Sequence, residues 1–169
     1  IDFLGDDIYL ATDFGFVIVD ASKGMIKNYT RPSSNVKANK AFTSVVAVPG
    51  YALGVNEGNL YCIPTDKRMT DLSNLKNLGL TLGNVELYGR GDGTFYASTY
   101  PDNANSTSTK YLRLYTFDPA QETCSLVTDY ALSPISHIWE KNGVCMVEIE
   151  GNGRISTHDI SSDSKSIEL

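Results

Sequence analysis

The side chains that most often carry catalysis are few in this chain. Its 169 residues include two histidines, His137 and His158. A serine-type hydrolase needs a histidine base beside a nucleophile on a strained turn, and the sequence contains no Gly-x-Ser-x-Gly stretch. His137 lies near Trp139 in a strand-like run, and His158 precedes Asp159 at the end of another. Both are interpreted as structural or solvated histidines, so no catalytic residue is assigned.

Metal and nucleotide motifs are also missing. The Asp102–Asn105 run supplies oxygen ligands, but the glycine and the bidentate acid of a calcium loop are absent at the required offsets. Neither the Walker nor the dinucleotide glycine pattern occurs. Cys62, Cys124 and Cys145 are odd in number, lack ligand spacing and sit in apolar runs, which favours buried free thiols. The alternative is one disulfide bond and one free thiol, if the compartment is oxidising. No metal or cofactor is expected.

A repeated β unit must position whatever functional residues the chain has. The run Ile8–Asp20 is typical of a β-hairpin, with a polar corner at Thr12–Gly15 whose glycine can adopt a positive φ. Similar runs begin at Tyr51, Phe95 and Val144. The successive intervals of about 43, 44 and 49 residues lie within or near the period of one four-stranded propeller blade.

The sequence therefore predicts an all-β fold of the β-propeller type, with about four four-stranded antiparallel blades that form part of a larger propeller. The expected repeats are about 1–41, 42–83, 84–134 and 135–169. The last strand of the second repeat is expected near Met69–Ser73, while the leucine-rich stretch 74–83 fits either a helical turn or a strand leading into the third repeat. The last strand of the fourth repeat is expected at Lys165–Leu169.

Repeats in register would place the turns between their second and third strands on one rim of the fold, here named the turn rim. Its candidate ligand-binding residues are Asp13, Phe14, Asn56, Glu57, Tyr100, Asp102, Glu150 and Asn152. Carboxylates and aromatic rings can hold a sugar by hydrogen bonds and stacking, or can receive a basic patch of a protein. The alternative is that these are ordinary hydrophilic turn residues without a ligand.

Composition narrows the classes of partner. The formal net charge of −6 argues against a surface that neutralises nucleic-acid phosphates. No apolar run approaches the roughly 18–20 residues of a membrane-spanning helix. A protein or a glycan is therefore the expected partner. Four blades in an open stack would leave apolar faces uncovered, so a homodimer or contact with further blades is also expected.

The Ile8–Asp20 run, followed by Met25–Tyr29, resembles the repeat of the two-component-regulator type of β-propeller in secreted and periplasmic proteins of Gram-negative bacteria. It is most similar to PorZ-like proteins, which are associated with the type IX secretion system. The resemblance is clear over residues 8–29 and is one of pattern in the other three repeats. It implies a propeller fold, a periplasmic, outer-membrane-surface or secreted location, and binding rather than chemistry.

The expected function is accordingly that of a non-catalytic binding or scaffold module of a secreted or cell-surface protein, which engages a protein or glycan through the turn rim. The alternative is a periplasmic ligand-sensing input domain of a two-component regulator. A propeller-based enzyme that degrades polysaccharides is the third hypothesis. It requires an acid and a base in the central funnel, and the sequence identifies no such pair.

Overall fold

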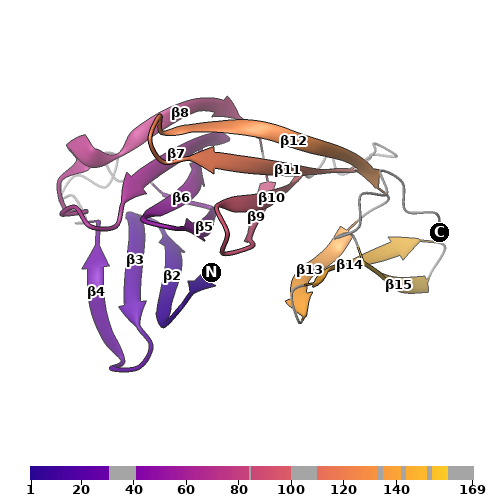
Figure 1. Ribbon diagram of the computed structural model, residues 1–169, viewed down its shortest axis with the longest axis horizontal. Helices are drawn as coiled ribbons and strands as arrows, with labels where there is room; N and C mark the ends of the chain where they lie inside the picture. The colour runs from indigo at the N-terminus through magenta and orange to yellow at the C-terminus, as the bar shows by residue number, and fades with distance from the viewer. Residues whose placement is uncertain are drawn as a thin grey trace.

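The computed structural model describes residues 1–30, 41–83, 85–99, 110–132, 135–141, 144–151 and 154–159. Most of these residues lie in strands, which form four separate antiparallel sheets (Figure 1). Within each sheet every strand pairs with its neighbour in the sequence, so each sheet is a simple meander. The predicted all-β, blade-like fold is confirmed.

The first sheet contains β1–β4 and the second contains β5–β8. Their bounds are β1 (Asp2–Leu4), β2 (Asp7–Thr12), β3 (Gly15–Asp20), β4 (Met25–Tyr29), β5 (Ser44–Val48), β6 (Tyr51–Asn56), β7 (Asn59–Pro64) and β8 (Lys76–Thr81). A short 3-10 helix, η2 (Leu72–Asn74), precedes β8.

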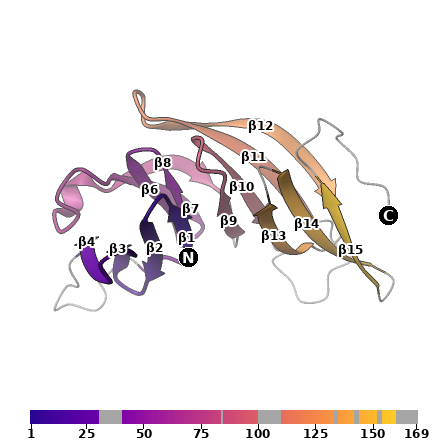
Figure 2. The same cartoon turned by 60° about the horizontal axis from the view of Figure 1, so that its bottom comes forward.

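The third sheet contains β9–β12 and the fourth contains β13–β15, and Figure 2 shows the fourth beyond the third at the far side from the first two. Their bounds are β9 (Val85–Gly89), β10 (Thr94–Thr99), β11 (Lys110–Asp118), β12 (Thr123–Leu132), β13 (Ile135–Lys141), β14 (Val144–Gly151) and β15 (Arg154–Asp159). The fourth sheet has three strands among the described residues, and the strand predicted at Lys165–Leu169 lies outside them.

The last strand of the second sheet differs from the prediction. Met69 is fully buried between the first and second sheets, and Asp71 caps η2 by accepting a hydrogen bond from Ser73 N, so no strand forms near Met69–Ser73. The strand is β8, and it completes the second sheet rather than leading into the third. Leu78 and Leu80 pack on the core from alternate positions, which is the period of a strand and excludes the helical turn.

The second sheet is buried on both faces. One face packs against the first sheet through Val45, Ala47, Ala52 and Ile63. The other packs against the third sheet through Val46, Val48, Leu53, Val55, Leu60 and Cys62. Successive side chains of a strand point to opposite faces, so the unbroken apolar run of β5 supplies both contacts.

The first strands of successive sheets are joined by hydrogen bonds, in which a side-chain oxygen atom of one sheet accepts from a backbone amide of the next sheet. Asp2 Oδ2 accepts a hydrogen bond from Ala47 N at 2.8 Å, and Ser44 Oγ accepts one from Leu87 N at 2.9 Å. Gly89 leaves room for the Asp2 carboxylate, since a Cβ at this position would lie 2.3 Å from Asp2 Oδ2. Burial raises the pKa of Asp2 above its ordinary value, although backbone hydrogen bonds oppose this change.

The corner of the first hairpin depends on close approach of Gly15 and Thr30. Thr30 Oγ1 accepts a hydrogen bond from Phe16 N at 2.7 Å and lies 3.2 Å from the carbonyl oxygen of Phe16, to which it can donate. Gly15 has a φ of 133°, and a Cβ at this position would lie 1.9 Å from Thr30 Oγ1. Both the backbone angle and the contact therefore require glycine.

Replacing Gly15 should destabilise the fold more than replacing a glycine that lacks this contact. We expect Gly15→Ala to lower the free energy of unfolding by about 2–4 kcal/mol, because the methyl group displaces Thr30. Gly5 also has a positive φ, 59°, but a Cβ at this position would meet nothing within 4 Å. Gly5→Ala should therefore cost about 1 kcal/mol. If urea unfolding gave the same loss of unfolding free energy for Gly15→Ala and Gly5→Ala, the Thr30 contact would be shown to be unimportant.

The thiols of Cys62 and Cys124 are free and lie in or beside the contact between the second and third sheets. Burial raises the pKa of each thiol from 9.0 to about 12. The expectation of free thiols is confirmed for these two cysteines. The side chain of Cys145 lies outside the described residues.

These pKa shifts predict a fall in stability at alkaline pH. Between about pH 9 and 12 the unfolded thiols ionise while the folded thiols keep their protons, so the free energy of unfolding decreases as pH rises. The decrease over this window should be smaller in a Cys62→Ala, Cys124→Ala variant than in the parent chain. Identical pH dependence of the two proteins in urea titrations would contradict the assigned burial of the thiols.

Candidate functional site

The structure places two of the predicted turns of the turn rim at the same end of neighbouring sheets. Asp13 and Phe14 join β2 to β3, and Glu57 with Gly58 joins β6 to β7. Both turns lie next to the connection that enters the second sheet, residues 41–43. The register expected for the first two repeats is therefore present in the fold.

Two hydrogen bonds hold this arrangement. Phe42 N donates to Thr12 O at 2.9 Å, which fixes the end of β2 to the connection. Asn56 Nδ2 donates to Ala41 O at 2.6 Å, which fixes the end of β6 to the same connection. Both turns are therefore attached to the same connection.

The side chains of the two turns differ in their exposure. Asp13 and Glu57 are exposed, and Phe14 is half-buried. Asn56 is buried, with 4% of its surface exposed, and its Oδ1 atom has no hydrogen-bond partner in the part of the chain that the structure describes. Asn56 therefore fixes the turn through its bond to Ala41 O, and the described exposed side chains of the turn rim are those of Asp13 and Glu57, beside the half-buried Phe14.

The other half of the turn rim falls outside the described side chains. Tyr100, Asp102 and Asn152 lie outside the described residues. Glu150 lies in β14, and its side chain is also outside the description. These four residues remain predictions.

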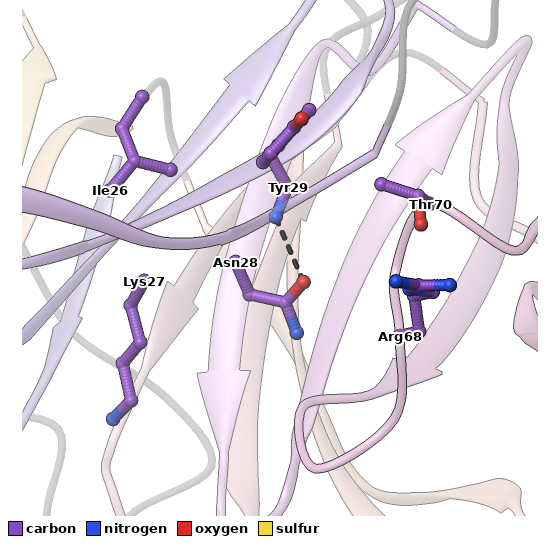
Figure 3. A pocket seen from close by; sticks show the side chains of 6 residues that line it. All are labelled: Ile26, Lys27, Asn28, Tyr29, Arg68 and Thr70. Atoms are coloured by element: carbon purple, nitrogen blue, oxygen red, sulfur yellow. Dashed lines mark hydrogen bonds between the residues drawn. The ribbon is translucent and has the colours of Figure 1, made fainter.

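A hollow that the sequence does not suggest lies between β4 and the connection from β7 to β8 (Figure 3). It has a volume of about 560 Å³, and its lining residues are Ile26, Lys27, Asn28, Tyr29, Arg68 and Thr70. A neighbouring hollow of about 430 Å³ shares Lys27 and Asn28 with it. The two walls are about 40 residues apart in the sequence and follow no motif, so pattern analysis gives no signal for them.

Asn28 ties the two walls of the hollow together. Its Nδ2 atom donates to Lys67 O at 2.9 Å and to Thr65 O at 3.3 Å. Its Oδ1 atom accepts from Tyr29 N at 3.0 Å and from Met69 N at 3.4 Å. The amide has then used both donor hydrogens and both acceptor sites, so we assign it a structural role rather than a ligand contact.

The charged groups of the hollow lie near solvent. Lys27 Nζ lies 2.6 Å from Asp7 Oδ2, and the lysine side chain is largely exposed. Figure 3 shows Arg68 and Thr70 on the wall opposite Lys27, with Asn28 between the two walls. Because the ion pair is exposed, it contributes at most about 1 kcal/mol to stability.

Metal-binding clusters and membrane-spanning helices are both absent from the described ranges. No group of three or more histidine, cysteine, aspartate or glutamate side chains suited to a metal ion occurs there. No described helix has the length and apolar character needed to cross a membrane.

No family model and no curated protein matches the chain. One similar solved structure is PorZ, an essential bacterial surface component of the type IX secretion system of Porphyromonas gingivalis, with 14% identity, a TM-score of 0.47 and coverage of 95% of this chain and 26% of that chain. Another is the extracellular domain of a protein described as a one-component system, BT4673 of B. thetaiotaomicron, with 12% identity, a TM-score of 0.37 and coverage of 96% and 27%.

The chain thus spans about a quarter of the length of these two solved structures. The first carries the PorZ name that the sequence resemblance suggests, and the second is described as the extracellular domain of a one-component system rather than of a two-component regulator. Both structures share less than 25% identity with this chain, and both TM-scores are below 0.5.

Asn28 and Lys27 are adjacent but should differ sharply in their contribution to stability. We expect Asn28→Ala to lower the free energy of unfolding by about 2–4 kcal/mol, because it leaves several backbone groups without partners. Lys27→Ala should lower it by less than about 1 kcal/mol, because its ion pair is exposed. Chemical unfolding of both variants measures the difference. A harmless Asn28→Ala change would show that the amide is available for a ligand.

Proposed function

We propose that this chain is a non-catalytic binding segment of a secreted or cell-surface bacterial protein, which engages a protein or a glycan through the turn rim. One observation supports the proposal above the others: two turns from different sheets are fixed to one connection and expose Asp13 and Glu57 at the same end of the fold. The resemblance of residues 8–29 to envelope proteins supports the location.

The turns are held from both sides, which favours binding. Thr30 anchors the first turn through its contacts with Phe16. In the second turn, Gly58 O accepts hydrogen bonds from Leu82 N at 2.8 Å and from Gly83 N at 3.1 Å. A surface whose backbone is already ordered loses less conformational entropy when a partner binds.

The chemistry of the turns fits a partner that donates hydrogen bonds. Carboxylates accept from sugar hydroxyls or from lysine and arginine side chains, and the ring of Phe14 adds an apolar edge. The net charge of −6 attracts a basic protein surface at low ionic strength. Carboxylates at exposed turn tips lack the water-excluded setting that tunes a catalytic acid, so we propose binding without chemistry.

The test removes two charges from the turn rim and, in a control, two charges from the opposite end of the same sheets. The rim variant is Asp13→Asn with Glu57→Gln. The control is Asp6→Asn with Asp66→Asn, because both residues are exposed and follow strand ends away from the turn rim. The probes are an array of neutral and amino-sugar glycans and an oligolysine peptide followed by fluorescence anisotropy.

We expect the parent chain to bind one of these probes, and the rim variant to bind it at least about tenfold more weakly, which is about 1.4 kcal/mol. The control should bind like the parent. Equal weakening in the two variants would indicate a general effect of charge, and absence of binding to every probe would count against the turn rim as a site.

A further inference from the structure

Three polar groups that line the hollow beside β4 have no partner within the part of the chain that the structure describes. They are the guanidinium of Arg68, the hydroxyl of Thr70 and the hydroxyl of Tyr29, and none of them makes a hydrogen bond or ion pair there. All three can donate hydrogen bonds. The hollow is therefore suited to a ligand that accepts them.

The wall that carries Arg68 and Thr70 is fixed before any ligand arrives. Met69 lies between these two residues and is fully buried. The carbonyl oxygen of Arg68 accepts hydrogen bonds from Asp71 N at 3.0 Å and from Asn74 Nδ2 at 3.2 Å. Figure 3 shows the side chains of Arg68 and Thr70 together on the wall opposite β4. A ligand that binds to an ordered wall loses less conformational entropy to the protein.

The charges around the hollow favour a singly charged anion. Lys27 is paired with Asp7, with Nζ 2.6 Å from Oδ2, so its charge is largely neutralised. Asp71 accepts a hydrogen bond from Ser73 N at 3.0 Å as the cap of η2. Hydrogen bonds from Ser73 lower the pKa of Asp71, and the charge of Arg68 adds to this effect without an ion pair. One guanidinium is thus left to bind an anion.

The shapes of the lining groups specify the anion further. A guanidinium presents a planar fork that matches the two oxygen atoms of a carboxylate, whereas a phosphate would bring a second charge. Ile26 is 63% exposed and Tyr29 is 42% exposed, and both line the same hollow. These side chains offer apolar surface beside the guanidinium. The ligand that fits has an apolar group next to its carboxylate.

The neighbouring hollow indicates where the rest of the ligand lies. Its lining residues include Asp7, Thr65 and Asp66, which present oxygen atoms and negative charge. A carboxylate is repelled there, while N–H groups can donate to these oxygen atoms. The volumes of about 560 and 430 Å³ are in the range of small-ligand sites. A peptide combines a terminal carboxylate with N–H groups behind it.

We propose that the hollow beside β4 binds the C-terminal end of a peptide whose last residue is apolar. Arg68 would hold the carboxylate through paired hydrogen bonds, and the Thr70 hydroxyl would donate another. The last side chain of the peptide would lie against Ile26 and Tyr29, and its backbone would continue toward the neighbouring hollow. This site is separate from the turn rim and does not depend on the function proposed for it.

A blocked dipeptide and its amide test the proposal. The probe is N-acetyl-alanyl-phenylalanine with a free carboxylate, and the comparison is the same dipeptide with a C-terminal amide. Galacturonate, a sugar carboxylate, is the third compound. Binding to the isotope-labelled chain is followed by NMR titration. The variants are Arg68→Gln and Thr70→Val, and the control is Lys67→Gln, because Lys67 is exposed beside Arg68 but is not among the described lining residues of either hollow.

We expect the acid to shift amide signals in β4 and around Arg68, and the amide to bind at least about tenfold more weakly. Arg68→Gln should weaken binding of the acid at least about tenfold, and Thr70→Val about fivefold, since it removes one neutral hydrogen bond. The Lys67→Gln control and the Asp13→Asn, Glu57→Gln rim variant should bind the acid like the parent chain.

Equal affinity for the acid and the amide would overturn the proposal, because the carboxylate would then not be recognised. Equal weakening by Arg68→Gln and Lys67→Gln would overturn it as well, since any nearby positive charge would serve. Absence of shifts at millimolar probe would count against a peptide site, and so would binding of galacturonate in place of the dipeptide.

Discussion

Burial of the second sheet on both faces is the constraint on which the rest of the structure depends. Its strands carry too much apolar surface for one contact, so the first sheet must cover one face and the third sheet the other. The first strands of these sheets consequently lie side by side, where Asp2 and Ser44 accept hydrogen bonds from backbone groups of the next sheet. The same stacking sets the turns of the first two sheets at one end, which creates the surface proposed for binding.

Local structure could be predicted from the sequence wherever one element contains its own signal. The Ile8–Asp20 hairpin follows from two apolar runs around a glycine corner, and β4 coincides with the Met25–Tyr29 run that belongs to the repeat resemblance. The sequence analysis predicted the last strand of the second sheet at the wrong position. Met69 is an apolar residue because it packs between the first and second sheets, and it is not part of a strand. In the leucine-rich stretch, Leu78 and Leu80 stand at alternate positions, and this spacing was the feature of the sequence that could have predicted β8.

Contacts between distant segments could not be predicted. Asp2 reaches Ala47 and Asn28 reaches Lys67, and neither pair follows from a repeat or a motif. These contacts also distinguish the two candidate sites, the hollow beside β4 and the turn rim. The hollow beside β4 has a central amide already used to join two sheets, whereas Asp13 and Glu57 are exposed on a support that other residues hold.

Native-state hydrogen exchange tests the central claim, that the second sheet is the shared core of the stack, most directly. Amides of β5 and β6 lie in the sheet that is covered on both faces, so they should exchange only through global unfolding, with the free energy measured by urea. Amides of β4 lie in an outer strand with largely exposed side chains and should exchange through local opening at lower free energy. Exchange of β5 as easily as β4 would contradict the account.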